Sequence, residues 1–524
     1  MDAPPDPTPA LPASPDGRPE LAAAVDLGSN SFHLLVARVE GDRLVVIDRL
    51  KERVRLAAGL GPDGRLSQES QDRALACLDR FGQRLRDMPP GSVRAVGTNT
   101  LRRAKNRPAF LEQAHAALGH PIEVVSGREE ARLVYLGVAH SVADPVPGAR
   151  RLVVDIGGGS TEIIIGENLQ PLAAESMYMG CVGYSLRFFP EGRLTEDAFQ
   201  QAFIAARLEM EPHKKRFRAM GWERALGSSG TILAVEEVLR AQGWGSRITD
   251  KALRRLRKAM VAAGHVDKLA LAGLQPERLS VFAGGVAILQ GVLRSLHLET
   301  LEAATGTIRE GALFDQLGRR HQQDARDATV LDLVARWSID ALQASRVERT
   351  ARVLLARVAA PWDLRDPELA KALSWAARLH ELGLTIGHSG YHRHGAYVLA
   401  QADMPGFSRQ DQEVLGILVR SHRRKLRVED FAGLPLALRR RVLRLAVLLR
   451  VAVRLHRSRS DRPLPPLVVR ASRDKLAATL FLGFEPGWLA EHPLTTADLD
   501  RERAYQELVK HHLVVADAEL PVRR

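Results

Sequence analysis

A glycine-rich segment that contains one acidic residue constrains the fold of this chain more than any other part of its sequence. The apolar run 152–156 includes Asp155 and leads into three consecutive glycines, and a second β-branched run, 163–165, follows. Two such runs around a glycine-rich turn are typical of a β-hairpin. Consecutive glycines let backbone N–H groups point into one concavity, which suits phosphate. The alternative is an ordinary glycine-rich hairpin with a surface aspartate.

A second copy of this pattern occurs near the start of the chain. Residues 24–31 (AVDLGSNS) match residues 153–160 (VVDIGGGS), so that Asp26 corresponds to Asp155. Because the copies lie too far apart for a solenoid unit, they suggest two duplicated domains. Two such turns facing each other across a cleft would hold a polyanion and its metal ion.

Length and charge restrict the class of protein further. With 524 residues the chain is long enough for three or four domains. Its formal net charge of +13 favours polyanionic partners such as polyphosphate, nucleotides, nucleic acid or anionic lipid. The low aromatic content of 5% argues against binding by base stacking, and no nucleic-acid recognition motif is present.

The remaining global features point to a cytoplasmic protein. Cys77 and Cys181 lie far apart and form no metal-binding pair, which favours a reducing compartment. Residues 1–20 are rich in proline and lack an apolar core, so we expect a disordered tail rather than a signal peptide. No run approaches 18 apolar residues, so no transmembrane segment is expected.

Two further segments of the first half carry candidate site residues. Arg102 follows a short strand and a small polar turn, and guanidinium groups at such a junction suit phosphate. A solvated arginine pair, with Arg103, is the alternative. Ser126 and Glu129 form a capping box, which leaves Glu130 without a structural task. The alternative for Glu130 is simple stabilisation by the helix dipole. The small-residue turn at 227–229 is another candidate anion site.

The second half has a different texture. From about residue 319 we expect helices over 329–344, 347–359, 367–381, 394–402, 409–422 and 436–456, with many arginines. Strands at 467–470 and 476–482 and a helix at 496–511 predict a small α+β cap. His380, His388, His392 and His422 resemble the spacing of His-Asp metal phosphohydrolases, but the dipeptide here is His380-Glu381. We therefore expect a helical domain for binding or dimerisation without a working metal site.

Taken together, these motifs identify a resemblance that covers nearly the whole chain. Segments 24–33, 97–102, 126–133, 154–162, 227–231 and 309–311 resemble the exopolyphosphatase/guanosine pentaphosphate phosphohydrolase family, and so do segments 377–383, 388–390 and 393–397. The resemblance implies a duplicated actin/Hsp70-like (ribonuclease H-like) α/β fold in the N-terminal half. It also implies an all-α HD-like third domain and homodimers that hold polyphosphate in a basic channel.

The residue pattern and the resemblance together give the expected domain limits and partners. We expect lobes at 21–136 and 137–318 with a hinge in the loop 144–150, a helical domain without the His-Asp metal pair at 319–465, and the α+β cap at 466–524. The expected cofactor is Mg²⁺, with K⁺ as a candidate activator. Inorganic polyphosphate and pppGpp are the expected substrates, and the basic patches are a candidate basis for peripheral contact with the inner membrane surface.

Site roles carried over from the family fall on matching positions. Glu130 matches the catalytic glutamate that activates water, and Asp155 and Glu162 match carboxylates that hold Mg²⁺ and the water. Phosphate-binding roles fall on Asp26, Ser29, Asn30, Ser31, Arg102, Gly157, Gly158, Gly159, Ser160, Gly227, Ser228 and Ser229.

The resemblance leaves two branches open. We favour the exopolyphosphatase branch because the turn ends in Gly159, whereas the pppGpp-hydrolysing branch often has alanine there. Residues 53–59 fit either branch. Two other classes are a non-catalytic sensor that binds polyphosphate or nucleotide, which the presence of all three carboxylates disfavours, and a kinase of the same fold, for which no acceptor-site signature is present.

Overall fold

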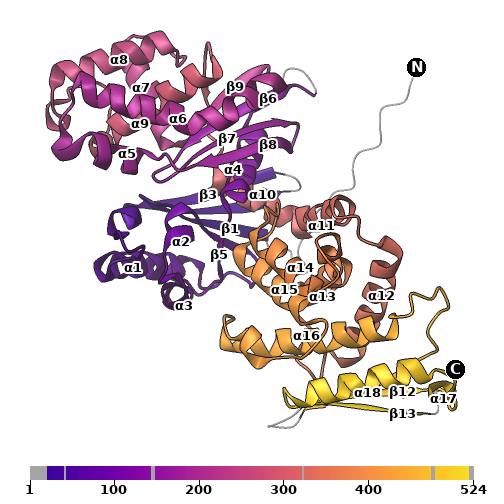
Figure 1. Ribbon diagram of the computed structural model, residues 1–524. Helices are drawn as coiled ribbons and strands as arrows, with labels where there is room; N and C mark the ends of the chain where they lie inside the picture. The colour runs from indigo at the N-terminus through magenta and orange to yellow at the C-terminus, as the bar shows by residue number, and fades with distance from the viewer. Residues whose placement is uncertain (1–19, 41–42, 143–147, 321–323, 474–477, 519–524) are drawn as a thin grey trace, which may run out of the picture. The chain divides into compact units, whose positions relative to one another are not determined.

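A computed structural model describes residues 20–40, 43–142, 148–320, 324–473 and 478–518 of this chain. It divides into two compact units, Met1–Asp324 and Ala325–Arg524 (Figure 1). The expected N-terminal tail, the expected turn at residues 41–42 and most of the expected hinge loop lie outside the described residues.

The first sheet of unit 1 is built from the segment that carries Asp26. Its five strands follow the order β3-β2-β1-β4-β5. They are β1 (Glu20–Leu27), β2 (Phe32–Glu40), β3 (Arg43–Glu52), β4 (Val93–Gly97) and β5 (Ile122–Val124). β1 and β2 form the predicted hairpin, and β4 runs parallel to β1. The helices that follow these strands are α1 (Gln68–Leu85), α2 (Asn99–Arg103) and α3 (Arg107–Leu118).

The second sheet repeats this topology. Its order, β8-β7-β6-β9-β10, matches the first sheet strand for strand. The strands are β6 (Arg150–Ile156), β7 (Thr161–Glu167), β8 (Gln170–Met177), β9 (Arg224–Ser228) and β10 (Glu302–Ala303). Asp155 lies opposite Glu162 in the β6–β7 hairpin, as Asp26 lies opposite His33 in the β1–β2 hairpin. The predicted duplicated actin/Hsp70-like fold is therefore confirmed, with His33 as the first-lobe counterpart of Glu162.

Helices cover both faces of each sheet. α1 and α3 bury Phe81 and Phe110 against one face of the first sheet. The other face packs against α10 (Ile308–Arg320), whose Leu313 joins the apolar side chains of β1 and β2. In the second lobe one face is covered by α5 (Cys181–Phe188), α6 (Glu196–Met220), α7 (Ser229–Ala241), α8 (Asp250–Ala263) and α9 (Leu279–Leu296). Its opposite face packs against α4 (Gly127–Ser141), which contributes Val134 and Tyr135.

The helices α4 and α10 exchange lobes. α4 follows the first sheet in the chain but packs on β7 and β8, whereas α10 follows the second sheet but packs on β1. The two helices meet each other between the sheets (Figure 1). Glycines allow this close crossing: a Cβ on Gly311 would lie 1.8 Å from the carbonyl oxygen of Leu133, and one on Gly137 would lie 2.0 Å from that of Thr307. The two lobes are thus joined where α4 and α10 cross, and the crossing leaves no space for a side chain at Gly137 or Gly311.

Unit 2 begins as a helical domain. Its helices are α11 (Ala325–Arg336), α12 (Ala341–Val358), α13 (Pro367–Leu379), α14 (Tyr391–Gln401), α15 (Arg409–Ser421) and α16 (Leu436–Leu455). The predicted break between the first two helices, at residues 345–346, was wrong. The chain breaks at 337–340, because Ser338 has a left-handed φ of 47° and the Asp340 side chain caps α12 by accepting from the Gln343 N–H.

The chain ends in the predicted α+β cap. The strands β11 (Val468–Arg473) and β12 (Ala478–Phe484) pair antiparallel, and β13 (His511–Asp517) adds to β12 in parallel. The helices α17 (Trp488–Glu491) and α18 (Pro493–Glu507) connect them. The expected helix over 496–511 therefore ends too late, and the third strand was missed. Its residues alternate in burial, as an edge strand on a packed sheet requires.

One helical segment, 276–296, is long and apolar enough to cross a membrane by length and composition alone. It contains α9, and 83% of its most apolar window is buried inside the second lobe. The expectation of no transmembrane segment rested on uninterrupted apolar runs, and this helix is interrupted by Arg278 and Arg294. We assign α9 to the core of the lobe.

Candidate active site

The two hairpin turns meet, as the duplicated pattern predicts. A Cβ on Gly158 would lie 3.2 Å from the Ser29 Cβ and 3.4 Å from the backbone nitrogen of Asn30. A Cβ on Gly159 would lie 2.9 Å from the Ser29 hydroxyl. The adjoining Ser31 and Ser160 are buried, and the Gly157 N–H donates to the Ser160 carbonyl at 2.9 Å. The predicted phosphate loops thus lie together, and the absence of side chains on the glycines allows the approach.

Three carboxylates lie beside these turns at the strand ends where the hairpins meet: Glu162 is buried, and Asp26 and Asp155 are half-buried. Burial raises the pKa of Asp26 to about 7, with Arg309 acting in the opposite direction. Burial and the charge of Glu130 raise the pKa of Asp155 to about 7. The pKa of Glu162 is also raised by burial and by Glu130. Because Glu130 influences all three groups, the four acidic side chains face one region, and negative charge there is costly without a cation.

Glu130 stands in the first turn of α4 and is held by Arg102. The Ser126 side chain caps this helix, as predicted, by accepting from the Glu129 N–H at 3.1 Å. Arg102, at the end of α2, donates to the Glu130 carboxylate at 2.5 Å and to the Val125 carbonyl at 3.1 Å. Burial opposes the charge of Arg102, but the carboxylates of Glu130 and Glu162 raise its pKa. The predicted arginine and glutamate are therefore direct partners.

The second predicted anion turn lies at the start of α7. Asp155 is paired in register with Ser228, and hydrogen bonding to Ser228 lowers the Asp155 pKa against the effect of burial. The Ser228 hydroxyl also lies 2.8 Å from the Gly306 carbonyl. Ser229 has a φ of 90°, which side-chain-bearing residues rarely adopt. Such strain is concentrated at functional sites, where it fixes backbone groups toward a ligand.

Sequence reasoning missed three residues of this region. Asn99 is buried, and its Nδ2 has no hydrogen-bond partner among the described residues, although its side-chain oxygen faces Gly159. Arg309 donates to the His33 Nδ1 at 2.8 Å. The positive charge of Arg309 lowers the pKa of Asp26 and of Asp155, against the effect of burial. Burial and the charge of Arg309 lower the pKa of His33 to about 3. Asn99 and Arg309 lie within the quoted motifs, but only the fold brings them to the hairpins.

Basic side chains gather around this region without carboxylate partners. Lys51, Arg53, Arg278 and Arg309 influence one another electrostatically, and none of them forms an ion pair with a carboxylate among the residues described. Burial, followed by the charge of Arg278, lowers the pKa of Lys51, while Glu277 acts in the opposite direction. Arg53, the residue after β3, donates to the Ser280 hydroxyl of α9 at 3.0 Å. We call these four residues the basic cluster.

The acidic residues fit a magnesium ion only with help from a substrate. Within the described parts of the chain, no three acidic, histidine or cysteine side chains are placed to hold a metal ion together. Mg²⁺ commonly binds to one or two carboxylates, with water and substrate phosphates completing its shell. Asp155, which is half-buried, and Glu162, which is buried, are paired across β6 and β7 and suit that arrangement. The roles of Mg²⁺ and K⁺ stay predictions.

The histidines of the helical domain pack among themselves. The ring centroids of His380 and His422 lie 5.3 Å apart, and burial lowers the pKa of both. The Nε2 of His422 lies 3.3 Å from the Tyr391 hydroxyl. Glu381, at the position where a metal-binding pair would have aspartate, binds Arg459 at 2.5 Å.

Comparison with known proteins agrees with the geometry of both units. Residues 35–320 match the model of the Ppx/GppA phosphatase family, and residues 325–503 match that of Ppx/GppA phosphatase domain III. This chain belongs to the Ppx/GppA phosphatase family. The family predicted from sequence is therefore confirmed.

Curated Ppx/GppA relatives match along almost their full length. One is the guanosine-5'-triphosphate,3'-diphosphate pyrophosphatase of Aeromonas hydrophila, 39% identical over 487 residues, which cover 93% of this chain and 97% of that protein. Another has the same name and comes from Vibrio cholerae, with 40% identity and coverage of 92% and 95%.

Solved structures of this family resemble unit 1. An exopolyphosphatase from Cytophaga hutchinsonii is 26% identical, with a TM-score of 0.52, and the match covers 57% of this chain and 98% of that one. A protein described as exopolyphosphatase-like is 25% identical with the same TM-score, covering 58% and 98%. Each match thus covers a little more than half of this chain and indicates a shared fold over that part.

Proposed function

We propose that this chain hydrolyses the terminal phosphoryl group of pppGpp to give ppGpp. The observation that carries the proposal is the meeting of Glu130, Arg102 and the two hairpin turns in a chain whose nearly full-length relatives are named for this substrate. Polyphosphate is the second candidate substrate, and the exopolyphosphatase named among the similar structures supports it. Both reactions transfer a terminal phosphoryl group to water.

The preference for exopolyphosphatase that was drawn from sequence rested on Gly159 alone. A Cβ at this position would lie 2.7 Å from the Asn99 side-chain oxygen and 2.9 Å from the Ser29 hydroxyl. Glycine at position 159 is therefore needed for the close contact between the two turns. This requirement is the same whether the terminal phosphate belongs to polyphosphate or to pppGpp. The relatives along the whole chain favour the alternative substrate, pppGpp.

In the proposed reaction Glu130 orients and activates the attacking water. Before substrate binds, Arg102 neutralises the Glu130 carboxylate at 2.5 Å. A substrate phosphate competes for the same guanidinium, so binding releases the carboxylate to accept a proton from water. Asn99 and the backbone N–H groups of residues 158–160 would then surround the phosphoryl oxygens. Asp155 and Glu162 would hold Mg²⁺, which supplies charge neutralisation on the phosphoryl group when bound.

The basic cluster supports a substrate with a second group of phosphates. The charges of Arg278, Arg309 and Arg53 disfavour the charge on Lys51, Glu277 acts in the opposite direction, and a bound anion would stabilise the whole cluster. The 3'-diphosphate of pppGpp is such an anion, and an extended polyphosphate chain would also fit the charge. A sensor without catalysis is disfavoured, because the acidic residues needed for hydrolysis are all present around the turns.

Phosphate release from pppGpp and from long-chain polyphosphate, at equal concentration of terminal phosphate and with Mg²⁺, tests the proposal. We expect a higher kcat/KM with pppGpp. Faster and processive release from polyphosphate would instead support an exopolyphosphatase. Tight binding of either compound without release would instead indicate a sensor. The homodimer, the cytoplasmic location and contact with a membrane surface stay predictions that this assay leaves aside.

A further inference from the structure

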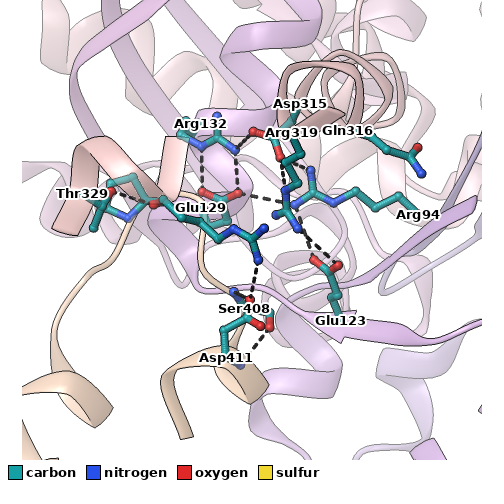
Figure 2. Close-up of polar contacts among 12 residues, drawn as sticks. Arg94, Glu123, Glu129, Arg132, Asp315, Gln316, Arg319, Thr329, Ser408 and Asp411 are labelled. Atoms are coloured by element: carbon teal, nitrogen blue, oxygen red, sulfur yellow. Dashed lines mark hydrogen bonds and ion pairs between the residues drawn. The ribbon is translucent and has the colours of Figure 1, made fainter. Parts of the chain in front are cut away.

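A buried network of ion pairs surrounds Glu129, the residue next to Glu130 (Figure 2). Arg132, one turn along α4, binds the Glu129 carboxylate with both arms of its guanidinium, at 2.7 and 2.8 Å. The same guanidinium also donates to Asp315 of α10. Arg94 of β4 donates to the other oxygen of Asp315. The carboxylate of Asp315 therefore connects α10 to both α4 and β4.

Two more residues extend the network at its edge. Arg319, one turn along α10, donates to Asp315 at 3.0 Å. Glu123 of β5 lies 3.4 Å from Arg94 and 3.6 Å from Arg319. Three guanidinium groups thus face three carboxylates, and the side chains at the centre are almost fully buried, with 0% exposure for Glu129 and 4% for Asp315.

The network is held in its ionised form. Burial alone would raise the pKa of Asp315, but the guanidinium groups of Arg132 and Arg94 keep it well below its usual value. Burial likewise opposes the charge on Arg132, and the carboxylates of Asp315 and Glu129 raise its pKa. A neutral side chain at position 315 would leave two buried guanidinium groups short of a negative partner.

This arrangement fixes the rotation of the first turn of α4. Successive helical residues point about 100° apart, since the helix has about 3.6 residues per turn. Glu129 points to the network, and Glu130 points to Arg102 at the hairpin turns. A rotation of the turn that moves Glu130 would therefore also pull Glu129 out of its bidentate contact with Arg132.

We propose that Asp315 is a positioning residue, which acts through Arg132 and Glu129 to hold Glu130 in line for water activation. The inference rests on the proposed function of Glu130 in phosphoryl hydrolysis. α10 follows the second sheet in the chain but packs on the first sheet. Through Asp315, this helix therefore sets the orientation of Glu130 on α4. Asp315 itself does not touch the substrate.

The test compares kcat and KM for pppGpp in the full-length protein and in Asp315→Asn. A misplacement of about 1 Å can lower a rate about 100-fold, so we expect kcat to fall about 10- to 100-fold while KM changes little. Asp250→Asn is the matched control. Asp250 also binds two arginines, Arg294 at 2.8 Å and Arg254 at 3.3 Å, but on α8 and α9 outside the network. Its kcat should stay within about twofold of wild type on the same scale.

A double variant separates positioning from general damage to the protein. If Asp315 acts through Glu130, then Asp315→Asn should change the turnover of Glu130→Gln by less than about twofold, because coupled residues are not additive. Equal fractional losses in both backgrounds would overturn the inference. So would an unchanged kcat in Asp315→Asn.

A milder variant covers the case in which Asp315→Asn does not fold. Arg132→Lys keeps the charge but loses the bidentate contact, and we expect the same fall in kcat, smaller in size. If circular dichroism shows that both variants are unfolded, the network supports the fold rather than Glu130, and the inference is wrong. Absence of phosphate release by the wild-type protein from either substrate would instead reject the proposed function.

Discussion

At the residue scale, the burial of Asp26 and Asp155 makes the stability of the metal-free protein depend on pH. Their pKa of about 7 in the fold lies above the ordinary value of 3.8, so the folded protein binds more protons than the unfolded chain between about pH 4 and 7. The free energy of unfolding should therefore fall as the pH rises through this window. Each pKa unit contributes about 1.4 kcal/mol.

Urea unfolding with a chelator, at pH 5 and pH 8, measures this dependence. We expect Asp155→Asn to be more stable than wild type at pH 8 and to lose part of the decline with pH, because the amide carries no charge in the buried site. Asp315→Asn should behave in the opposite way and be less stable at pH 8, since ion pairs hold the pKa of Asp315 low. An Asp155→Asn protein that is less stable than wild type at pH 8 would contradict the assignment.

The residues that sequence reasoning placed correctly are those with a local signature. The Asp-Gly pattern predicted that Asp26 and Asp155 would end strands at glycine-rich turns, and Ser126 predicted the start of α4. Asn99 and Arg309 have no such signature. Their place beside the turns depends on the pairing of β4 with β1 and on the return of α10, which are contacts between distant segments.

At the element scale, the crossing of α4 and α10 depends on glycine. Replacing a helical glycine with alanine ordinarily stabilises a helix by up to about 1 kcal/mol. Gly311→Ala should instead destabilise the protein by about 1–3 kcal/mol, as overpacking does. The new methyl group would meet the Leu133 carbonyl at 1.8 Å, and backbone atoms cannot move aside cheaply.

Gly183→Ala is the control for this substitution. Gly183 also lies within a helix, α5, but a Cβ there would have no atom within 4 Å. Thermal unfolding should show a Tm equal to or higher than that of wild type for Gly183→Ala and a lower Tm for Gly311→Ala. An unchanged Tm for Gly311→Ala would mean that the two helices separate easily.

Helices were predicted well where apolar residues recur at helical spacing, but the ends of helices and strands were predicted poorly. The helices over 409–421 and 436–455 agree with the sequence within a residue or two. The break between α11 and α12 was misplaced, because the turn at Ser338 has no glycine or proline to mark it. β13 was missed because the turn before it, where Lys510 has a left-handed φ of 58°, contains no glycine or proline to mark it.

At the scale of the whole molecule, part of the excess positive charge lies in the basic cluster, where we expect it to bind substrate phosphates. Lys51 is an exposed member of this cluster, whereas Arg53 and Arg309 are held by hydrogen bonds to Ser280 and His33. Lys51→Ala should raise the KM for pppGpp several-fold and leave kcat nearly unchanged, because we expect the residue to bind the 3'-diphosphate rather than the reacting phosphate.

The comparison substrate for Lys51→Ala is GTP, which has the same terminal phosphate but no 3'-diphosphate. The rise in KM should be smaller with GTP, and it should shrink for pppGpp as salt is added. Arg193→Ala, at an exposed ion pair with Glu191, serves as the control for a lost surface charge. Equal effects of Lys51→Ala on both substrates would show that the basic cluster does not bind the 3'-diphosphate.

Glu130 is the residue on which the proposed hydrolysis depends most directly. Single-turnover hydrolysis of pppGpp by Glu130→Gln, together with the Kd of the same protein for pppGpp, tests it. General-base help is worth about 100- to 10,000-fold, so the variant should bind pppGpp about as tightly as wild type and hydrolyse it at least about 100 times more slowly. Hydrolysis at a near-normal rate would contradict the role of Glu130 and the proposal built on it.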